Sequence, residues 1–151
     1  MLQIGAVIPD LTVTDETGDT LSLHDVARGY WVLYFYPKDD TPGCTSEAAQ
    51  FRDAYDDFKA KGAEIVGCSR DSVASHAKFK EKYGLPFRLL ADADSAVCDA
   101  FGVIVEKNMY GKKAQGVARA TFLVGPDKKI VRVWPKVAVG GHADEVLAAV
   151  P

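Results

Sequence analysis

Cys44 is the residue whose surroundings point most clearly to chemistry. It stands in the run Thr41-Pro42-Gly43-Cys44-Thr45-Ser46, where its neighbours are small, polar or turn-forming rather than core residues. An apolar run over residues 30–36 ends shortly before it, and apolar residues at helical spacing begin shortly after it. At a junction of strand and helix, unpaired backbone N–H groups and the helix dipole favour an anion. We therefore expect this thiol to lose its proton more easily than a free one, and the thiolate is the nucleophile.

The other residues of reactive type offer Cys44 no partner by motif. A cysteine protease or transferase would pair the thiolate with a histidine, but no motif ties Cys44 to any of the three, His24, His76 and His142. We interpret His76 and His142 as surface or capping residues. Cys68 lies in a strand-like segment and Cys98 in a short helical one, so core packing is expected for both. No Cys-x-x-Cys pair is present, and no arginine stands six positions after any cysteine.

A thiolate with small polar donors and no protein base suits a substrate that is already primed for attack. The weak O–O bond of a peroxide is such a substrate. In that reaction Cys44 would become a sulfenic acid, the first step in the oxidation of a thiol.

The segments that must position Cys44 predict an alternation of strands and helices. The expected elements are, in order, a hairpin over 10–23, a helical turn over 24–26, a strand over 30–36, a helix over 45–61, a strand over 63–69, a helix over 73–83, a strand over 85–90, a helix over 94–101, a polar loop over 105–113, a hairpin of 119–124 with 130–134, and a helix over 142–150. Strand, helix and strand of these lengths form a right-handed βαβ unit, and ligands gather beyond the carboxyl ends of its strands. The order predicts an α/β domain with a mixed central sheet and helices on both faces.

Size and composition limit the class of protein. With 151 residues, 48% of them hydrophobic and 26% charged, the chain fits one globular domain over 1–151. The net charge of −3 and the lack of a basic cluster make nucleic acid and anionic membrane poor partners. Residues 1–5 show no secretory signal, and the longest apolar run has only strand length. Three widely spaced cysteines favour a reducing, cytoplasmic location over a disulfide framework, and neither a metal nor a cofactor is expected.

Several strings together resemble a known family. Pro37-x-x-x-Thr41-x-x-Cys44 matches the signature of the peroxiredoxins, and the string from Phe35 to Glu47 resembles the bacterioferritin-comigratory (BCP), or PrxQ, branch. The resemblance continues through Ser72-x-x-Ser75-His76-x-x-Phe79-x-x-Lys82-Tyr83, Leu85-Pro86-Phe87-x-Leu89-Leu90-x-Asp92, Phe101-Gly102-Val103 and Arg119-x-Thr121-Phe122. It implies a thioredoxin-like fold and a thiol peroxidase that reduces hydrogen peroxide and organic hydroperoxides. Thioredoxin or another thiol would re-reduce the enzyme, and a monomer is expected because relatives in this branch are often monomeric.

The resemblance also implies roles for individual residues. Cys44 would be the peroxidatic cysteine, Thr41 would hold the substrate through its hydroxyl, and Pro37 would wall the pocket. Arg119 would favour the thiolate and stabilise charge on the departing oxygen. A guanidinium suits that role because it is a fixed charge with several donors, and preorganised donors stabilise developing charge. If the strand after Arg119 runs antiparallel to 30–36, Arg119 lies near the end where Cys44 emerges.

The sequence departs from its relatives in the resolving cysteine. The two familiar positions for that residue hold Ala49 and Lys80. A sulfenic acid at Cys44 must therefore be resolved by an outside thiol, by Cys98 or Cys68 after local unfolding, or by a second subunit. Cys98 is preferred to Cys68 because a short helix opens more cheaply than a central strand. Two other functions stay open, a redox sensor that uses the same cysteine and a chaperone-like holdase.

Overall fold

A five-stranded mixed sheet forms the centre of the molecule. The computed structural model describes residues 1–151, apart from the side chain of Met109. The sheet has the strand order β5-β4-β3-β8-β9, with the bounds β3 Tyr30–Phe35, β4 Ala63–Ser69, β5 Arg88–Ala91, β8 Ala120–Val124 and β9 Ile130–Trp134. Strands β3, β4 and β5 are parallel, whereas β8 is antiparallel to both β3 and β9. The predicted mixed sheet is confirmed, as is the antiparallel course of the strand that follows Arg119.

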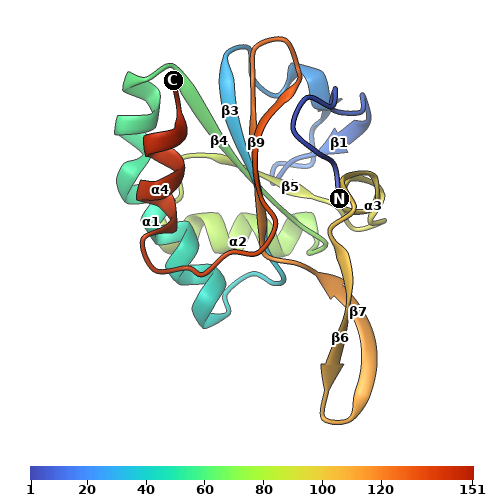
Figure 1. Cartoon of the computed structure of the whole chain (residues 1–151). Coiled ribbons are helices and arrows are strands. Elements are labelled where there is room, and N and C mark those ends of the chain that lie inside the picture. Colours follow the sequence, from blue (N-terminus) through green and yellow to red (C-terminus); the bar gives the residue numbers. More distant parts are fainter.

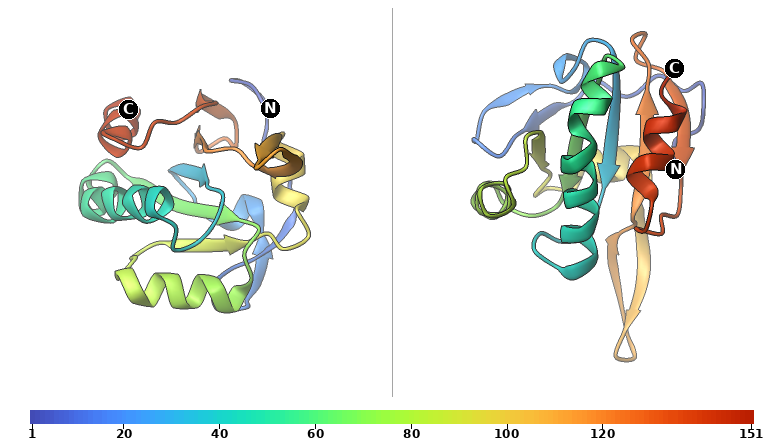
Figure 2. Two further views of the ribbon diagram at one scale, coloured as in Figure 1. Left: turned by 90° about the horizontal axis from the view of Figure 1, so that it is seen from below. Right: turned by 90° about the vertical axis from the view of Figure 1, so that its left-hand side faces the viewer.

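Helices cover both faces of this sheet. Figures 1 and 2 show α1 (Pro42–Ala60), α2 (Val73–Tyr83) and α4 (His142–Ala149) on one face. The short helix α3 (Ala96–Phe101) lies on the other face, together with the N-terminal segment and the hairpin of β1 (Thr12–Thr14) and β2 (Thr20–Ser22). A 3₁₀ turn, η1 (Leu23–Asp25), leads from this hairpin towards β3.

The sheet separates two apolar cores, and β3 supplies side chains to both. Trp31, Leu33 and Phe35 pack into what we term the α3-side core, which includes Val97 and Phe101 of α3. The alternate residues Val32 and Tyr34, with Tyr36 just after the strand, pack into the α1-side core, which includes Cys44, Phe51 and Phe58 of α1. Successive side chains of a strand point to opposite faces. A strand covered on both faces therefore reads as a continuous apolar run, as residues 30–36 do.

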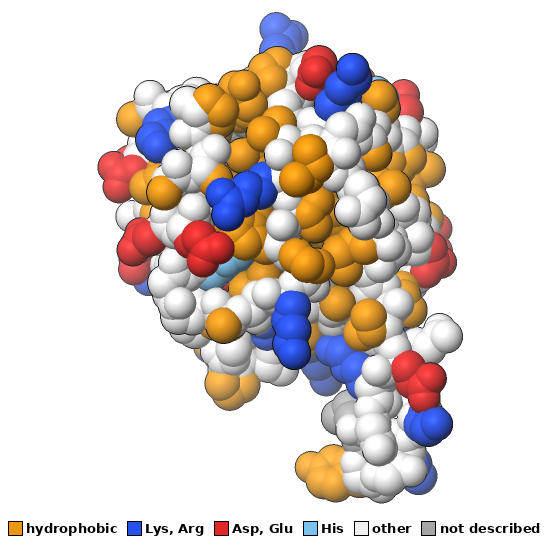
Figure 3. All heavy atoms as spheres, viewed as in Figure 1, with side chains coloured by type: hydrophobic (Ala, Val, Ile, Leu, Met, Phe, Trp, Pro, Cys, Tyr) orange, Lys and Arg blue, Asp and Glu red, His pale blue; other side chains and the backbone are white. Residues whose placement is uncertain are grey.

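The prediction of a loop over 105–113 is wrong. Residues Ile104–Met109 and Lys112–Val117 form the antiparallel strands β6 and β7. They make a hairpin that projects from the body of the molecule and carries several charged side chains (Figures 1 and 3). Tyr110 and Gly111 turn the chain with φ of 53° and 79°, the left-handed pair that two-residue hairpin turns require. The hairpin escaped prediction because its exposed strands show no alternation of apolar and polar residues.

Several predicted boundaries also shift. Helix α1 begins at Pro42 rather than near residue 45, so Cys44 lies within its first turn. Strand β5 begins at Arg88, not at residue 85, and α3 begins at Ala96, not at residue 94. Within the described part of the chain, no helix combines the length and the apolar character that crossing a bilayer requires.

Candidate active site

Cys44 lies in the first turn of α1, just beyond the carboxyl end of β3. Thr41 is the N-cap residue of this helix and has extended backbone, with φ −98° and ψ 156°, and Pro42 follows at the first helical position. Proline is favoured there because its missing N–H would have no partner in the helix. The Cys44 side chain is buried, with 2% of its surface exposed. The thiol thus sits at the positive end of a 19-residue helix and out of bulk solvent.

Arg119 brings a positive charge into contact with this sulfur. Its Nη2 atom donates to Cys44 Sγ at 3.3 Å, and its Nη1 atom donates to Glu47 Oε1 at 2.8 Å. The sheet register explains the contact, because Ala120 pairs with Phe35 and Arg119 therefore lies next to the end of β3. Gly43 leaves room for the guanidinium, since a Cβ atom there would lie 3.1 Å from Arg119 Nη2.

Glu47 is a buried carboxyl group that shares Arg119 with the thiol. It is 1% exposed, and its Oε2 atom has no hydrogen-bond partner among the described residues. Burial raises the pKa of Glu47 from 4.5 to about 7, because the loss of hydration outweighs the attraction and hydrogen bond of Arg119. Burial opposes the charge of Arg119, but the bond to Cys44 and the attraction of Glu47 raise the pKa of its guanidinium overall. Arg119 is therefore a permanent cation held between two acidic groups.

Thr41 and Pro37 lie on the segment that joins β3 to α1. The hydroxyl of Thr41 donates to the carbonyl oxygen of Lys38 at 2.8 Å, which leaves its oxygen lone pairs free to accept a hydrogen bond. Thr41 and Pro37 are both half-buried. A second cation, Lys107 of β6, donates to the Val117 carbonyl oxygen at 2.8 Å near the base of the projecting hairpin. Burial, followed by repulsion from Arg119, lowers the pKa of Lys107.

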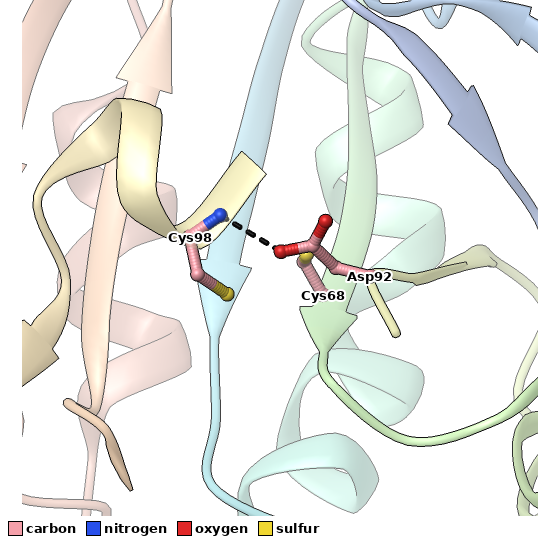
Figure 4. Close-up of side chains that lie close together, drawn as sticks. All are labelled: Cys68, Asp92 and Cys98. Carbon is pink, nitrogen blue, oxygen red and sulfur yellow. Dashed lines mark hydrogen bonds between the residues drawn. The ribbon is translucent and has the colours of Figure 1, made fainter. Parts of the chain in front are cut away.

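Cys98 and Cys68 lie on the opposite side of the sheet from Cys44. Both are fully buried in the α3-side core, whereas Cys44 belongs to the α1-side core. Figure 4 shows their sulfur atoms close together beside Asp92, whose Oδ2 atom accepts the Cys98 backbone N–H at 2.8 Å. The two sulfurs and a carboxylate oxygen of Asp92 lie within 4.8 Å of one another. Burial, followed by the hydrogen bond to Cys98, raises the pKa of the Cys68 thiol. The structure thus brings Cys44 and Arg119 together but does not bring Cys98 to Cys44.

Three buried ionisable residues, Glu47, Asp39 and His76, were missed by the sequence analysis. Glu47 could have been suspected, because residues three apart share one face of a helix. Asp39 and His76 are both buried and joined at 2.6 Å, so the interpretation of His76 as a surface residue is wrong. His142 does begin α4 as expected, but it is buried and bonded to the Thr121 hydroxyl at 2.8 Å.

Sequence comparisons relate this chain to known proteins. The sequence profile of the AhpC/TSA family matches residues 4–133. The chain is 48% identical to Peroxiredoxin Bcp of Xanthomonas campestris pv. campestris over 99% of its own length and 93% of the relative. It is 44% identical to Peroxiredoxin Bcp of Bacillus subtilis, over 97% of this chain and 93% of that protein.

Solved structures give the same result. The fold superimposes on Peroxiredoxin Q of Xanthomonas campestris with a TM-score of 0.90 and 48% identity, covering 99% of this chain and 95% of that one. Peroxidoxin BcpB of Mycobacterium tuberculosis gives a TM-score of 0.88 and 36% identity, covering 99% and 97% of the two chains. A structure of the Xanthomonas campestris bacterioferritin comigratory protein, described for its alkyl peroxide reduction activity, gives a TM-score of 0.90 at 47% identity and covers 99% and 96%. The protein therefore belongs to the AhpC/TSA family and, within it, to the Bcp/PrxQ peroxiredoxins, thiol peroxidases with a thioredoxin-like fold.

Proposed function

We propose that Cys44 is the peroxidatic cysteine of this thiol peroxidase. Its thiolate attacks one oxygen of the substrate, an S–O bond forms and the O–O bond breaks. The sulfur is oxidised to a sulfenic acid, and the second oxygen departs with the electron pair and is protonated to water or an alcohol. This proposal rests on the 3.3 Å contact between Arg119 Nη2 and Cys44 Sγ. The contact places a fixed cation beside the thiolate and beside the departing oxygen on which negative charge develops.

The neighbouring residues divide the remaining tasks. Arg119 stabilises the thiolate and the charge that develops on the departing oxygen, as preorganised donors do in a site shielded from water. Thr41 accepts a hydrogen bond from the peroxide hydroxyl, since its own proton is directed at the Lys38 carbonyl. Pro37 forms part of the wall at the end of β3. Glu47 fixes the guanidinium by a bond of 2.8 Å.

Hydrogen peroxide and organic hydroperoxides are the proposed substrates. The alkyl peroxide reduction described for the Xanthomonas campestris relative supports the organic class. A thiol sensor that oxidises without turnover is less well supported, because the relatives found are named as peroxiredoxins. We further propose a monomer that acts in the cytoplasm, in keeping with three free cysteines, and without nucleic acid as a partner.

The reductant is proposed to be an external thiol, with thioredoxin as the first candidate. The placement of Cys98 and Cys68 in the α3-side core supports this route, since the sheet separates both from Cys44. Resolution by Cys98 would need α3 to leave its core and cross to the other face.

A coupled assay tests the proposal. Wild type, Cys44→Ser and Cys68→Ala are supplied with hydrogen peroxide or an alkyl hydroperoxide and with thioredoxin, glutaredoxin or a small thiol. We expect Cys44→Ser to keep the fold, as seen by circular dichroism, and to lose turnover with every pair. Cys68→Ala is the matched control, a buried cysteine whose replacement should leave turnover unchanged. Wild-type turnover in Cys44→Ser would refute the assignment.

A further inference from the structure

A second cluster of buried ionisable groups lies directly against the segment that precedes Cys44. Asp39, in the loop between β3 and α1, is 7% exposed, and His76, near the start of α2, is fully buried. Their side chains meet with 2.6 Å between His76 Nδ1 and Asp39 Oδ2. Charged groups are rarely buried unless they are paired, and the peroxidatic chemistry proposed above uses neither of these residues.

The hydrogen bonds fix where the protons lie. His76 Nε2 is 2.8 Å from the carbonyl oxygen of Leu90, which can only accept, so Nε2 carries a hydrogen. Asp39 also accepts the Tyr36 hydroxyl at 2.6 Å and the Ser75 hydroxyl at 2.8 Å. The 2.6 Å contact between His76 Nδ1 and Asp39 Oδ2 needs one hydrogen between the two atoms, and two hydroxyl donors already directed at the carboxyl group favour placing that hydrogen on the nitrogen. His76 Nδ1 therefore also carries a hydrogen, and the pair is a buried imidazolium with a carboxylate.

These bonds leave no free ligand atom on the histidine. Asp39, Asp71 and His76 offer ligand atoms within 4.8 Å of one another, the spacing of a metal site. Both ring nitrogens of His76 serve as donors, however, and a metal would need a lone pair on one of them. The cluster is thus better explained as a clamp between protein segments.

The clamp fastens the loop before Cys44 to α2 and to the segment that leads into α2. The Asp39 backbone N–H donates to Asp71 Oδ2 at 3.0 Å, in the segment that leads into α2. The next residue, Asp40, has a left-handed φ of 56° and accepts Lys82 Nζ at 2.7 Å and the Tyr83 hydroxyl at 2.5 Å. Asp39 and Asp40 therefore bind α2 near both of its ends.

The next residues along the chain are those of the active site. Thr41 follows the clamp directly, and Cys44 stands three residues further on. We propose that His76 and Asp39 are positioning residues for Cys44, a buried ion pair that holds the β3–α1 loop so that the Thr41 hydroxyl and the Cys44 thiolate keep their geometry. This inference rests on the proposed role of Cys44 and adds two residues that touch neither the substrate nor the sulfur.

If the clamp titrates, the rate of Cys44 oxidation should fall as pH rises, whereas ionisation of the thiol alone would make it rise. Burial opposes the charge, but the hydrogen bond and attraction of Asp39, with smaller help from Leu90 and Asp71, raise the pKa of His76. Stabilisation by the charged pair is therefore complete at low pH and is lost as pH rises through that raised value. Once Nδ1 loses its hydrogen, its lone pair faces the carboxylate and the loop loosens. Tyr36 does not compete in this range, because burial raises the pKa of its hydroxyl far above the ordinary value.

The rate of Cys44 oxidation should therefore fall at alkaline pH. The thiolate fraction itself can only rise there, so titration of the sulfur cannot produce that fall. We expect stopped-flow measurements of Cys44 oxidation by hydrogen peroxide, from about pH 6 to about pH 10, to show an alkaline decline in the wild type. His76→Asn keeps an amide donor near Asp39 but cannot titrate. It should lower the rate near neutral pH roughly tenfold, because a small misplacement of a reacting group costs about that much or more, and it should abolish the decline.

His142→Asn is the matched control. His142 is also a buried histidine, but its bond is to Thr121 of β8 rather than to the Cys44 loop. It should lower the melting temperature and keep both the rate and the alkaline decline. Asp39→Asn removes the charge of the other member of the pair, and it provides the test if His76→Asn fails to fold.

Two results would overturn the inference. One is a folded His76→Asn or Asp39→Asn protein with the rate and pH profile of the wild type, and the other is a wild type without the decline. Cys44→Ser is measured in parallel. If it stays active, the proposed function has failed; if it is inactive while the clamp variants behave like the wild type, only the inference about the clamp has failed.

Discussion

Replacing Glu47 by glutamine should make the protein more stable at alkaline pH, although it removes one member of an ion pair. Glu47 is 1% exposed and one of its oxygens has no partner. Glutamine has the same shape as the protonated acid, and its amide oxygen can still accept the bond from Arg119 Nη1. The variant no longer has to hold a negative charge in an apolar core.

The size of the effect follows from the pKa of Glu47, which burial raises from 4.5 to about 7. Because the folded-state pKa is the higher one, stability is greatest below the unfolded-state pKa and falls as pH rises towards about 7. At about 1.4 kcal/mol per pH unit, the full loss is roughly 3 kcal/mol. Between about pH 5 and about pH 8 the wild type should lose roughly 2 to 3 kcal/mol by this route, and Glu47→Gln none.

Urea unfolding at these two pH values measures the difference. We expect the variant to gain roughly 2 to 3 kcal/mol over the wild type between about pH 5 and about pH 8. Glu106→Gln is the control, an exposed acid paired with Lys113 at 3.5 Å, which should alter the pH dependence by well under about 1 kcal/mol. Parallel stability curves for Glu47→Gln and the wild type would refute the reasoning, because they would mean that Glu47 is already ionised at no cost.

Three further substitutions test other parts of the structure. Arg119→Lys keeps the charge but cannot fork between two acidic groups, so stopped-flow oxidation of Cys44 should slow roughly 10- to 100-fold; an unchanged rate would contradict the geometry. Cys98→Ala should turn over peroxide with thioredoxin like the wild type, and mapping of oxidised wild type should find no Cys44–Cys98 peptide, whose recovery would favour internal resolution. Gly67→Ala would place a Cβ atom 3.0 Å from the Tyr34 ring, and thermal unfolding should show a loss of roughly 1 to 3 kcal/mol from overpacking.

The sequence predicted best where one segment carries its own signal. Residues 30–36 form a continuous apolar run because two cores cover β3, and a run of that kind can be read without any partner. The N-terminus of α1 carried a local signal too, since Thr41 occupies the N-cap position and Pro42 the first helical position. The predicted start of the helix, near residue 45, was three residues late, and the structure places Cys44 in the first turn, one of the two positions that the sequence allowed.

Prediction failed where a residue depends on a distant partner. His76 is flanked by Ser75 and stands on a short helix, which locally resembles a solvated face; its burial depends on Asp39, 37 residues earlier. Arg119 alone would read as an ordinary charge at the start of a strand. Only its antiparallel register beside β3 brings it to Cys44, 75 residues away. Spacing within one segment cannot encode such contacts, so family resemblance was needed to assign the arginine.

The two halves of the proposed reaction make opposite demands on the same turn of helix. Peroxide is small enough to reach a sulfur that is 2% exposed, and its reaction benefits from the closed site in which Arg119 touches Cys44. A protein thiol is far larger and must contact the sulfenic sulfur itself, which this burial prevents. The first turn of α1 therefore has to open for reduction. This opening is opposed by the hydrogen bond from Arg119 and by the hydrogen bonds that join the Asp39 loop to α2. Cys98 and Cys68 are buried on the other side of the sheet. On the proposed external route, variants that loosen the clamp should slow oxidation while making the sulfenic acid easier for an external thiol to reduce. Measuring the two half-reactions separately in Asp39→Asn would test this, and a parallel slowing of both would show that the clamp does not govern opening.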